Sequence, residues 1–211
     1  MSDTIREYVM VKDRFAHAKI EEVGQYKYHG DLLYTDDIYY MLNDVFKMDR
    51  LITEVSYVIS FDHAKKPKGI CKVGQGDASE TPTPLQSIFT FLLLTGANSF
   101  ILVHNHVSDM PEASKEDKQT TLQVMNMAAT FSIDFIGHMI INPNGYIIEG
   151  GSTDGARAEL DEDGDLVSEF EENINTDVVF NGTETADEFI EKAYNEIKKM
   201  SKKLDILEGE S

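Results

Sequence analysis

The sequence predicts an α/β domain that carries an acidic C-terminal extension. Three observations predict it: β-forming runs alternate with segments of helical period, one run is continuously apolar, and the composition changes after Gly150. The chain has 211 residues, of which 41% are hydrophobic and 27% are charged, as in ordinary globular proteins. That length suits one sizeable domain with an appendage.

Charge and cysteine content limit the function classes. The chain has 19 Lys and Arg against 38 Asp and Glu, so its formal net charge is −19 at pH 7. Such a chain repels phosphate backbones, which disfavours general nucleic-acid binding and leaves room only for a local basic patch. Cys71 is the single cysteine, so nothing requires an oxidising compartment. With no signal peptide and no apolar stretch of bilayer length, we expect a cytoplasmic protein without membrane contact.

Six segments have the composition of strands. They are residues 8–11, 54–62, 70–73, 99–103, 133–141 and 146–149. The second and third are expected to pair, because the loop between them contains Pro67 and Gly69. The fourth is continuously apolar, which is typical of a strand covered on both faces. The last two are expected to form a hairpin around a turn at residues 142–145.

Three segments have apolar residues at helical spacing. They are residues 36–46, 85–95 and 115–131. Thr35 or Asp36 can cap the first helix, and Gly96 ends the second. The apolar stripe of the third is expected to consist of Leu122, Met125, Ala128 and Ala129.

Residues 1–34 form an N-terminal segment, and residues 35–150 form the predicted domain. Residues 151–182 are acidic and rich in turn-forming residues, so we predict an acidic linker. Residues 183–211 are predicted to form an amphipathic helix with a capping-box start. Its apolar face consists of Phe189, Ala193, Ile197, Met200 and Leu204. We expect this helix to pack on the domain, to bind a partner, or to mediate self-association.

The residues with metal-binding chemistry follow the apolar strand. His104 and His106 are two residues apart, so on a strand both imidazoles point to one face and can meet one metal ion. Asp117 can complete a His/His/Asp set after a short loop. Three protein ligands leave a fourth tetrahedral position for water, and zinc makes hydroxide available from that water. A plainer interpretation is a chance histidine pair with Ser114 as a helix cap, although a capping role of Ser114 is also compatible with a metal site.

A hydrolase with such a site also needs a general base outside the ligand set. Glu54 begins an otherwise apolar strand, where an ionisable side chain requires a reason. A solvated strand end is the plainer interpretation of this residue.

These residues resemble a known motif. The JAMM motif of JAB/MPN metalloproteases is reproduced in order and spacing by Glu54, His104, His106, Ser114 and Asp117. The chain most resembles the RadC-like branch, because SFILVHNHVSDMPEASKEDKQTT is similar to that branch's ILxHNHPSGxPxPSxxDxxxT. The segments EVSYVISFDHAKKPKGICKVG and IDFIGHMIINPNGYII also resemble its two strand pairs. The resemblance covers about residues 35–149.

The resemblance implies a cytidine-deaminase-like three-layer domain, with a curved mixed β-sheet flanked by helices. It implies that His104, His106 and Asp117 bind Zn²⁺. Glu54 would then pass a proton from the metal-activated water to the leaving amine, and Ser114 would stabilise the oxyanion. The implied activity is that of a zinc metalloprotease, which cleaves a peptide, isopeptide or related amide bond of an unidentified peptide or protein substrate.

The chain departs from the pattern of the branch in the loop at Met110-Pro111-Glu112 and at three single positions. Val107 stands in place of proline, Asp109 in place of glycine, and Gln86 in place of arginine. The metal ligands are intact, so these changes bear on the loop shape and on any anion contact of that arginine. His138 matches a histidine of the branch, and we expect it to support a ligand, because a fourth protein ligand would close the site.

Two other functions stay open from the sequence. A non-catalytic JAB-fold protein-interaction module would account for the acidic tail and terminal helix, but it has no need of an open coordination position. A DNA-repair-associated role follows from the RadC name, whereas the net charge of −19 argues against broad DNA binding.

Overall fold

The computed structural model describes residues 3–76, 85–108, 112–153, 156–160 and 166–170. In these ranges the strands form one mixed sheet of nine strands in the order β2-β1-β4-β3-β5-β6-β7-β8-β9. Two neighbouring pairs, β1 with β4 and β5 with β6, are parallel. The strands are β1 (Asp3–Lys12), β2 (Ala18–Tyr28), β3 (Glu54–Phe61), β4 (Pro67–Gly76), β5 (Ser99–Asn105), β6 (Asp134–Asn142), β7 (Gly145–Glu149), β8 (Ala156–Leu160) and β9 (Leu166–Phe170).

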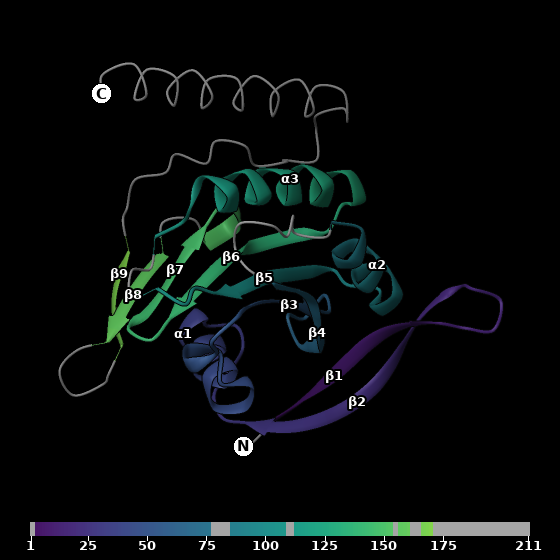
Figure 1. The fold of residues 1–211 in the computed structure, drawn as a ribbon, viewed down its shortest axis with the longest axis horizontal. Helices are drawn as coiled ribbons and strands as arrows, with labels where there is room; N and C mark the ends of the chain where they lie inside the picture. Colours follow the sequence, from purple (N-terminus) through teal and green to yellow (C-terminus); the bar gives the residue numbers. More distant parts are fainter. Residues whose placement is uncertain (1–2, 77–84, 109–111, 154–155, 161–165, 171–211) are drawn as a thin grey trace, which may run out of the picture. The chain divides into compact units, whose positions relative to one another are not determined.

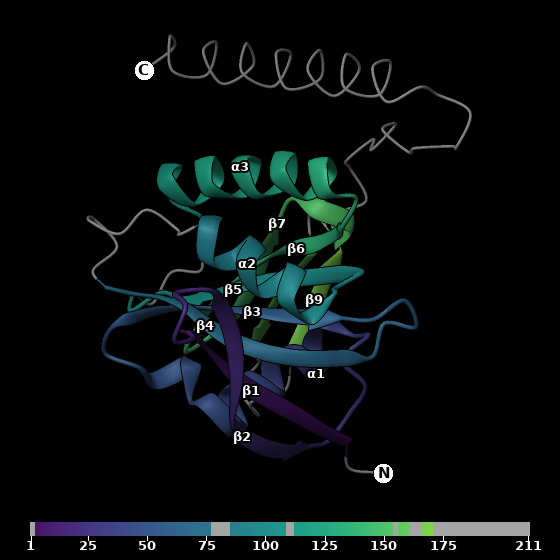
Figure 2. The same cartoon turned by 90° about the vertical axis from the view of Figure 1, so that its right-hand side faces the viewer.

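Helices cover both faces of the curved sheet, so the domain has three layers. Helices α2 (Leu85–Thr95) and α3 (Lys115–Phe131) lie on one face (Figures 1 and 2). Helix α1 (Thr35–Met41) lies on the other face and continues into a π-helical turn, η1 (Leu42–Phe46), and a 3₁₀ turn, η2 (Met48–Arg50). This arrangement confirms the predicted α/β class with a mixed sheet flanked by helices.

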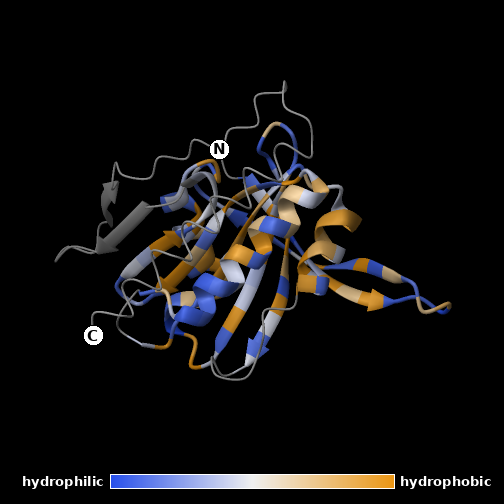
Figure 3. Cartoon of the chain, turned by 90° about the horizontal axis from the view of Figure 1, so that it is seen from above, coloured by the Kyte–Doolittle hydropathy of each residue, from blue (hydrophilic) through white to orange (hydrophobic). Residues whose placement is uncertain are grey.

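Each face of the sheet has its own hydrophobic core. The core under α1 contains Ile59 and Ile101, whereas the core under α2 and α3 contains Val58 and Leu102. Neighbouring residues of β3 and β5 therefore serve opposite cores, as strand alternation requires. The N-terminal half of α3 is hydrophilic and its C-terminal half is more apolar (Figure 3).

The predicted central elements are confirmed. The strand pair β3–β4 is antiparallel, β5 is buried along its whole length, and β6 and β7 form the predicted hairpin. Helix α2 ends at Gly96, whose φ is +59°. None of the helices in the described ranges has the length and apolar character that crossing a bilayer requires.

Helix α1 does not use the predicted side-chain cap. Its N-cap residue is Tyr34, which makes no capping hydrogen bond with its side chain. The hydroxyl of Thr35 instead lies 2.7 Å from the hydroxyl of Tyr146, which also donates to Asp36. The first turn of α1 is thereby tied to β7.

The predicted stripe of α3 is also partly wrong. The buried residues of this helix are Thr121, Val124 and Ala128, whereas Met125 is 37% exposed. The buried face of α3 differs from the predicted stripe because Thr121 has a polar partner, His138, inside the domain. A threonine therefore occupies a place on the buried face that hydrophobicity assigns to an apolar residue.

Both ends of the described chain extend the sheet beyond the predicted elements. The segment of residues 1–34 contains the β1–β2 hairpin, whose second strand is mostly exposed and so lacks apolar alternation. Strands β8 and β9 lie in the region from residue 151 onward, where the sequence predicted a linker. The predicted helix at residues 183–211 lies outside the described residues.

Candidate metal centre

Two histidines project from the end of β5 toward α3. Strand alternation places His104 on the face of Leu102, which belongs to the core under α2 and α3. The backbone N–H of His106 donates to the Ile141 carbonyl at 2.8 Å, which continues the pairing with β6 beyond the end of β5. His106 is thus held on the same face as His104, and the centroids of the two imidazole rings lie 4.8 Å apart.

The first turn of α3 supplies the carboxylate. Ser114 is the N-cap: its hydroxyl oxygen accepts from the Asp117 N–H at 3.1 Å, and its own N–H donates to Asp117 Oδ2 at 2.8 Å. This capping box holds Asp117 toward β5. Its Oδ1 lies 3.2 Å from Nε2 of His104, and its Oδ2 lies 3.2 Å from Nε2 of His106. The capping role and the predicted ligand position of Asp117 therefore occur together.

The surroundings set the charges of this cluster. Burial alone would raise the pKa of the Asp117 carboxyl, but the imidazoles of His104 and His106 and the Ser114 hydroxyl bring that pKa well below its usual value. Burial lowers the pKa of His138 well below its usual value, and the nearby His104 lowers it further. At neutral pH, Asp117 is therefore ionised and His138 is a neutral imidazole.

A chain of hydrogen bonds continues from His104 into the domain. The Thr121 hydroxyl donates to the Asp117 carbonyl at 2.8 Å, so it can only accept from Nδ1 of His138, which lies 2.8 Å away. A neutral His138 with a hydrogen on Nδ1 accepts at Nε2. That atom lies 2.7 Å from Nδ1 of His104, which is therefore the donor. A neutral His104 then keeps an unprotonated Nε2.

The residues of this cluster fit a zinc ion. Ligand atoms of His104, His106 and Asp117 all lie within 4.8 Å of one another. Nε2 of His104 is buried and makes no hydrogen bond with any residue of the described ranges. The carboxylate of Asp117 lies 3.2 Å from Nε2 of each histidine, through a different oxygen in each case, so both imidazoles face the same carboxylate. His138 is not part of this group and contacts Nδ1 of His104 instead.

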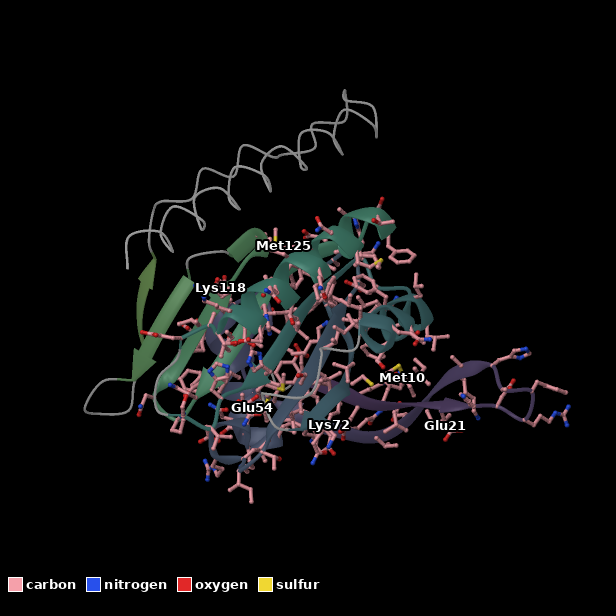
Figure 4. All side chains as sticks on the ribbon, turned by 45° about the horizontal axis from the view of Figure 1, so that its top comes forward. Met10, Glu21, Glu54, Lys72, Lys118 and Met125 are labelled. Atoms are coloured by element: carbon pink, nitrogen blue, oxygen red, sulfur yellow. The ribbon has the colours of Figure 1, made fainter. Side chains whose placement is uncertain are left out.

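Glu54 begins β3, the strand next to β5. Ser56 pairs with His104, so Glu54, two residues earlier, lies on the same face of the sheet as the histidines. Its side chain is half-buried. Glu54 and Lys118, in the first turn of α3, lie at the same end of the domain, whereas Glu21 lies out on the β1–β2 hairpin (Figure 4).

The structure adds two residues that the sequence analysis missed. Thr121 supports His138 from α3, and Asn105 lies between the two histidines with its side chain on the opposite face of the sheet. The spacing of Thr121 from Asp117, four residues along one helix face, was a usable signal. Nothing in the sequence pattern indicated the contacts of Asn105.

The comparisons with known proteins agree with this fold. The family model of the RadC-like JAB domain matches residues 34–148. A UPF0758 protein of Coprothermobacter proteolyticus is 25% identical over 91 residues, which are 43% of this chain and 39% of the relative. A UPF0758 protein of Clostridioides difficile is 27% identical over 113 residues, 54% of this chain and 44% of the relative.

A further UPF0758 protein, from Staphylococcus aureus, is 30% identical over 107 residues, which are 49% of each chain. The chain thus matches less than half the length of each of these curated relatives. The family match itself covers more than half of this chain. The chain therefore belongs to the RadC-like JAB-domain family.

Proposed function

We propose that this chain is a zinc-dependent JAMM-type hydrolase, which cleaves a peptide, isopeptide or related amide bond in a peptide or protein substrate. The observation that carries the proposal is the group of ligand atoms from His104, His106 and Asp117 within 4.8 Å. Two nitrogens and one oxygen from the protein are a donor set of catalytic zinc sites, which keep one position open for water or substrate.

The proposal gives each element of the cluster a role. Zinc held by His104, His106 and Asp117 would lower the pKa of a bound water toward neutrality. Glu54, on the same face of the sheet as the histidines, would act as the general base and return the proton to the leaving amine. Its half-buried environment keeps the carboxylate partly shielded from bulk water.

Ser114 has a hydroxyl next to a ligand. In the proposed reaction it donates a hydrogen bond to the oxyanion that forms on the substrate carbonyl. That hydroxyl donates to Asp117 Oδ2 at 2.6 Å, so it must exchange this partner for the substrate during the reaction. Its backbone N–H stays bonded to the same carboxylate oxygen at 2.8 Å, which keeps Asp117 in place meanwhile.

Metal content tests the ligand set first. The protein is purified without added metal, and elemental analysis compares it with His106→Ala and with His63→Ala, a control on an exposed histidine of the β3–β4 loop. We expect about one zinc per chain in the unaltered protein and in the control, and little in His106→Ala. Equal zinc in all three proteins would reject the site.

Turnover then tests the base. A peptide pool prepared from a whole proteome is incubated with each protein, and new termini are identified by mass spectrometry. We expect new termini from the unaltered protein and from the hairpin control Glu21→Gln, but not from Glu54→Gln, which should retain its zinc. Zinc binding without any new termini would contradict hydrolysis and favour the interaction-module alternative.

A further inference from the structure

The backbone on either side of Glu54 faces β5 beyond the end of the ladder between β3 and β5. The ladder ends at the pair Ser56–His104. The Val55 N–H, at the start of β3, and the Thr53 carbonyl, just before it, lie beyond this pair and have no partner in that ladder. Val55 is buried, so its N–H needs a hydrogen-bond partner, because an unsatisfied buried backbone group costs about 1–3 kcal/mol.

Asn105 supplies both partners with one side chain. Its Oδ1 accepts from the Val55 N–H at 2.8 Å, and its Nδ2 donates to the Thr53 carbonyl at 3.2 Å. An amide side chain offers an acceptor and a donor side by side on one planar group. Asn105 has no exposed surface, and its bond to the Val55 N–H is buried, whereas its bond to the Thr53 carbonyl is partly buried.

The two hydrogen bonds straddle Glu54. The Thr53 carbonyl belongs to the peptide plane before the Cα atom of Glu54, and the Val55 N–H belongs to the plane after it. Fixing both planes fixes φ and ψ of Glu54, and these angles set the direction in which its Cβ leaves the strand.

The same side chain joins Glu54 to the metal cluster. Asn105 lies between His104 and His106, and strand alternation directs its amide to the opposite face of the sheet. We propose that Asn105 is a positioning residue, which holds Glu54 in place relative to the strand that carries the two histidines. This inference rests on the proposed function, because it requires Glu54 to act on water at that cluster.

The alternative is a purely structural role, in which Asn105 satisfies two backbone groups and nothing more. The chain offers a matched control for that role. Asn142 is also fully buried at the end of a strand, and its Oδ1 accepts from the Asn144 N–H at 2.9 Å in the β6–β7 turn. Replacing either asparagine by leucine conserves the shape and removes the amide.

The test uses the full chain loaded with cobalt(II) in place of zinc. The pH midpoint of the change in visible absorption reports the ionisation of water at the metal, and Glu54→Gln calibrates how far that midpoint moves when the base is lost. We expect Asn105→Leu to retain cobalt binding and to move the midpoint in the same direction, by about half a unit or more. Asn142→Leu is expected to leave it unchanged. Asn105→Ser, which leaves room for a water molecule, replaces the leucine variant if that variant does not fold.

The outcomes separate the two proposals. If the midpoint responds to Glu54→Gln but not to the Asn105 variants, or if Asn142→Leu moves it equally, the positioning role is overturned while the proposed function stands. If the protein binds no cobalt, or if Glu54→Gln leaves the midpoint in place, the proposed function is overturned and this inference with it.

Discussion

Nδ1 of His104 lies 2.7 Å from Nε2 of His138, and this contact links the metal cluster to the core of the domain. His138 is fully buried and is held in turn by the Thr121 hydroxyl at 2.8 Å. The chain of hydrogen bonds leaves Nε2 of His104 as the atom that can bind a metal. Partners of this kind orient a ligand and raise its basicity.

Replacing His138 is therefore expected to weaken zinc binding. His138→Phe keeps the bulk of the ring but removes the acceptor for His104, and we expect a loss of about 10–100-fold in zinc affinity. Thr121→Val removes only the more distant hydroxyl, so it should cause a smaller loss of zinc affinity. Competition with a chromogenic chelator measures both, with the exposed His17→Phe as control. An unchanged affinity in His138→Phe would show that the contact does not support the ligand.

The stability of the metal-free protein should fall as the pH falls below about 6.5. Burial holds the pKa of His138 well below its usual value, so the folded state keeps this imidazole neutral. The unfolded chain protonates it near pH 6.5, so below that pH the unfolded state binds more protons and gains relative stability. The stabilisation by the neutral His138 is complete above pH 6.5. It is lost as the pH falls toward the pKa of His138 in the folded protein, by at most about 1.4 kcal/mol per pH unit.

Urea denaturation with a chelator present, at several pH values between 7 and 5, measures this loss. His138→Gln should show a smaller dependence on pH than the unaltered protein, whereas His17→Gln, whose side chain is 76% exposed in the unaltered protein, should match it. The same slope in all three proteins would contradict a neutral, buried His138.

Much of the fold could be predicted because local signals and burial agree there. The run at residues 99–103 is continuously apolar, and β5 is indeed buried on both faces. Gly96 ends α2 in the left-handed conformation, as its sequence position indicated. The grouping of His104, His106 and Asp117 could be predicted because the two histidines stand at the end of one strand and Asp117 follows in the first turn of the next helix.

The missed features depend on contacts between distant segments. The buried face of α3 contains Thr121 because His138 lies opposite it, and a helical pattern alone cannot reveal a partner on β6. Strand β2 was missed because most of its residues are exposed, which removes the alternation that identifies strands. The role of Asn105 depends on Thr53 and Val55, about fifty residues away in the sequence.

Another prediction concerns Gly151, in the turn after β7. Gly151 has a φ of +76°, and a Cβ atom there would lie 2.7 Å from the backbone of Phe135 and Ile136. Gly96 has a similar φ of +59°, but its Cβ would meet only the end of Lys68, at 3.5 Å. Both changes to alanine incur the left-handed penalty of about 1–2 kcal/mol, and Gly151→Ala should lose about 1–3 kcal/mol more because backbone must shift. Equal midpoints of urea denaturation for the two variants would contradict this packing.

The last prediction concerns Cys71 on β4, which is fully buried in the core under α2 and α3. Burial raises the pKa of its thiol to about 11. Since the thiolate is the reactive form, we expect the folded protein at pH 8 to resist a thiol reagent that labels one cysteine per chain once the protein is unfolded.

The same shift has a consequence for stability at high pH. The unfolded chain ionises this thiol near pH 8.5, whereas the folded protein keeps it protonated to about pH 11. The contribution of Cys71 to the free energy of unfolding is therefore complete below pH 8.5 and is lost as the pH rises toward 11. Cys71→Ala should show a smaller loss of stability between pH 8.5 and 11 than the unaltered protein, because it lacks the buried thiol. Rapid labelling of the folded protein, or identical pH dependence in the two proteins, would show that the strand opens to solvent at Cys71.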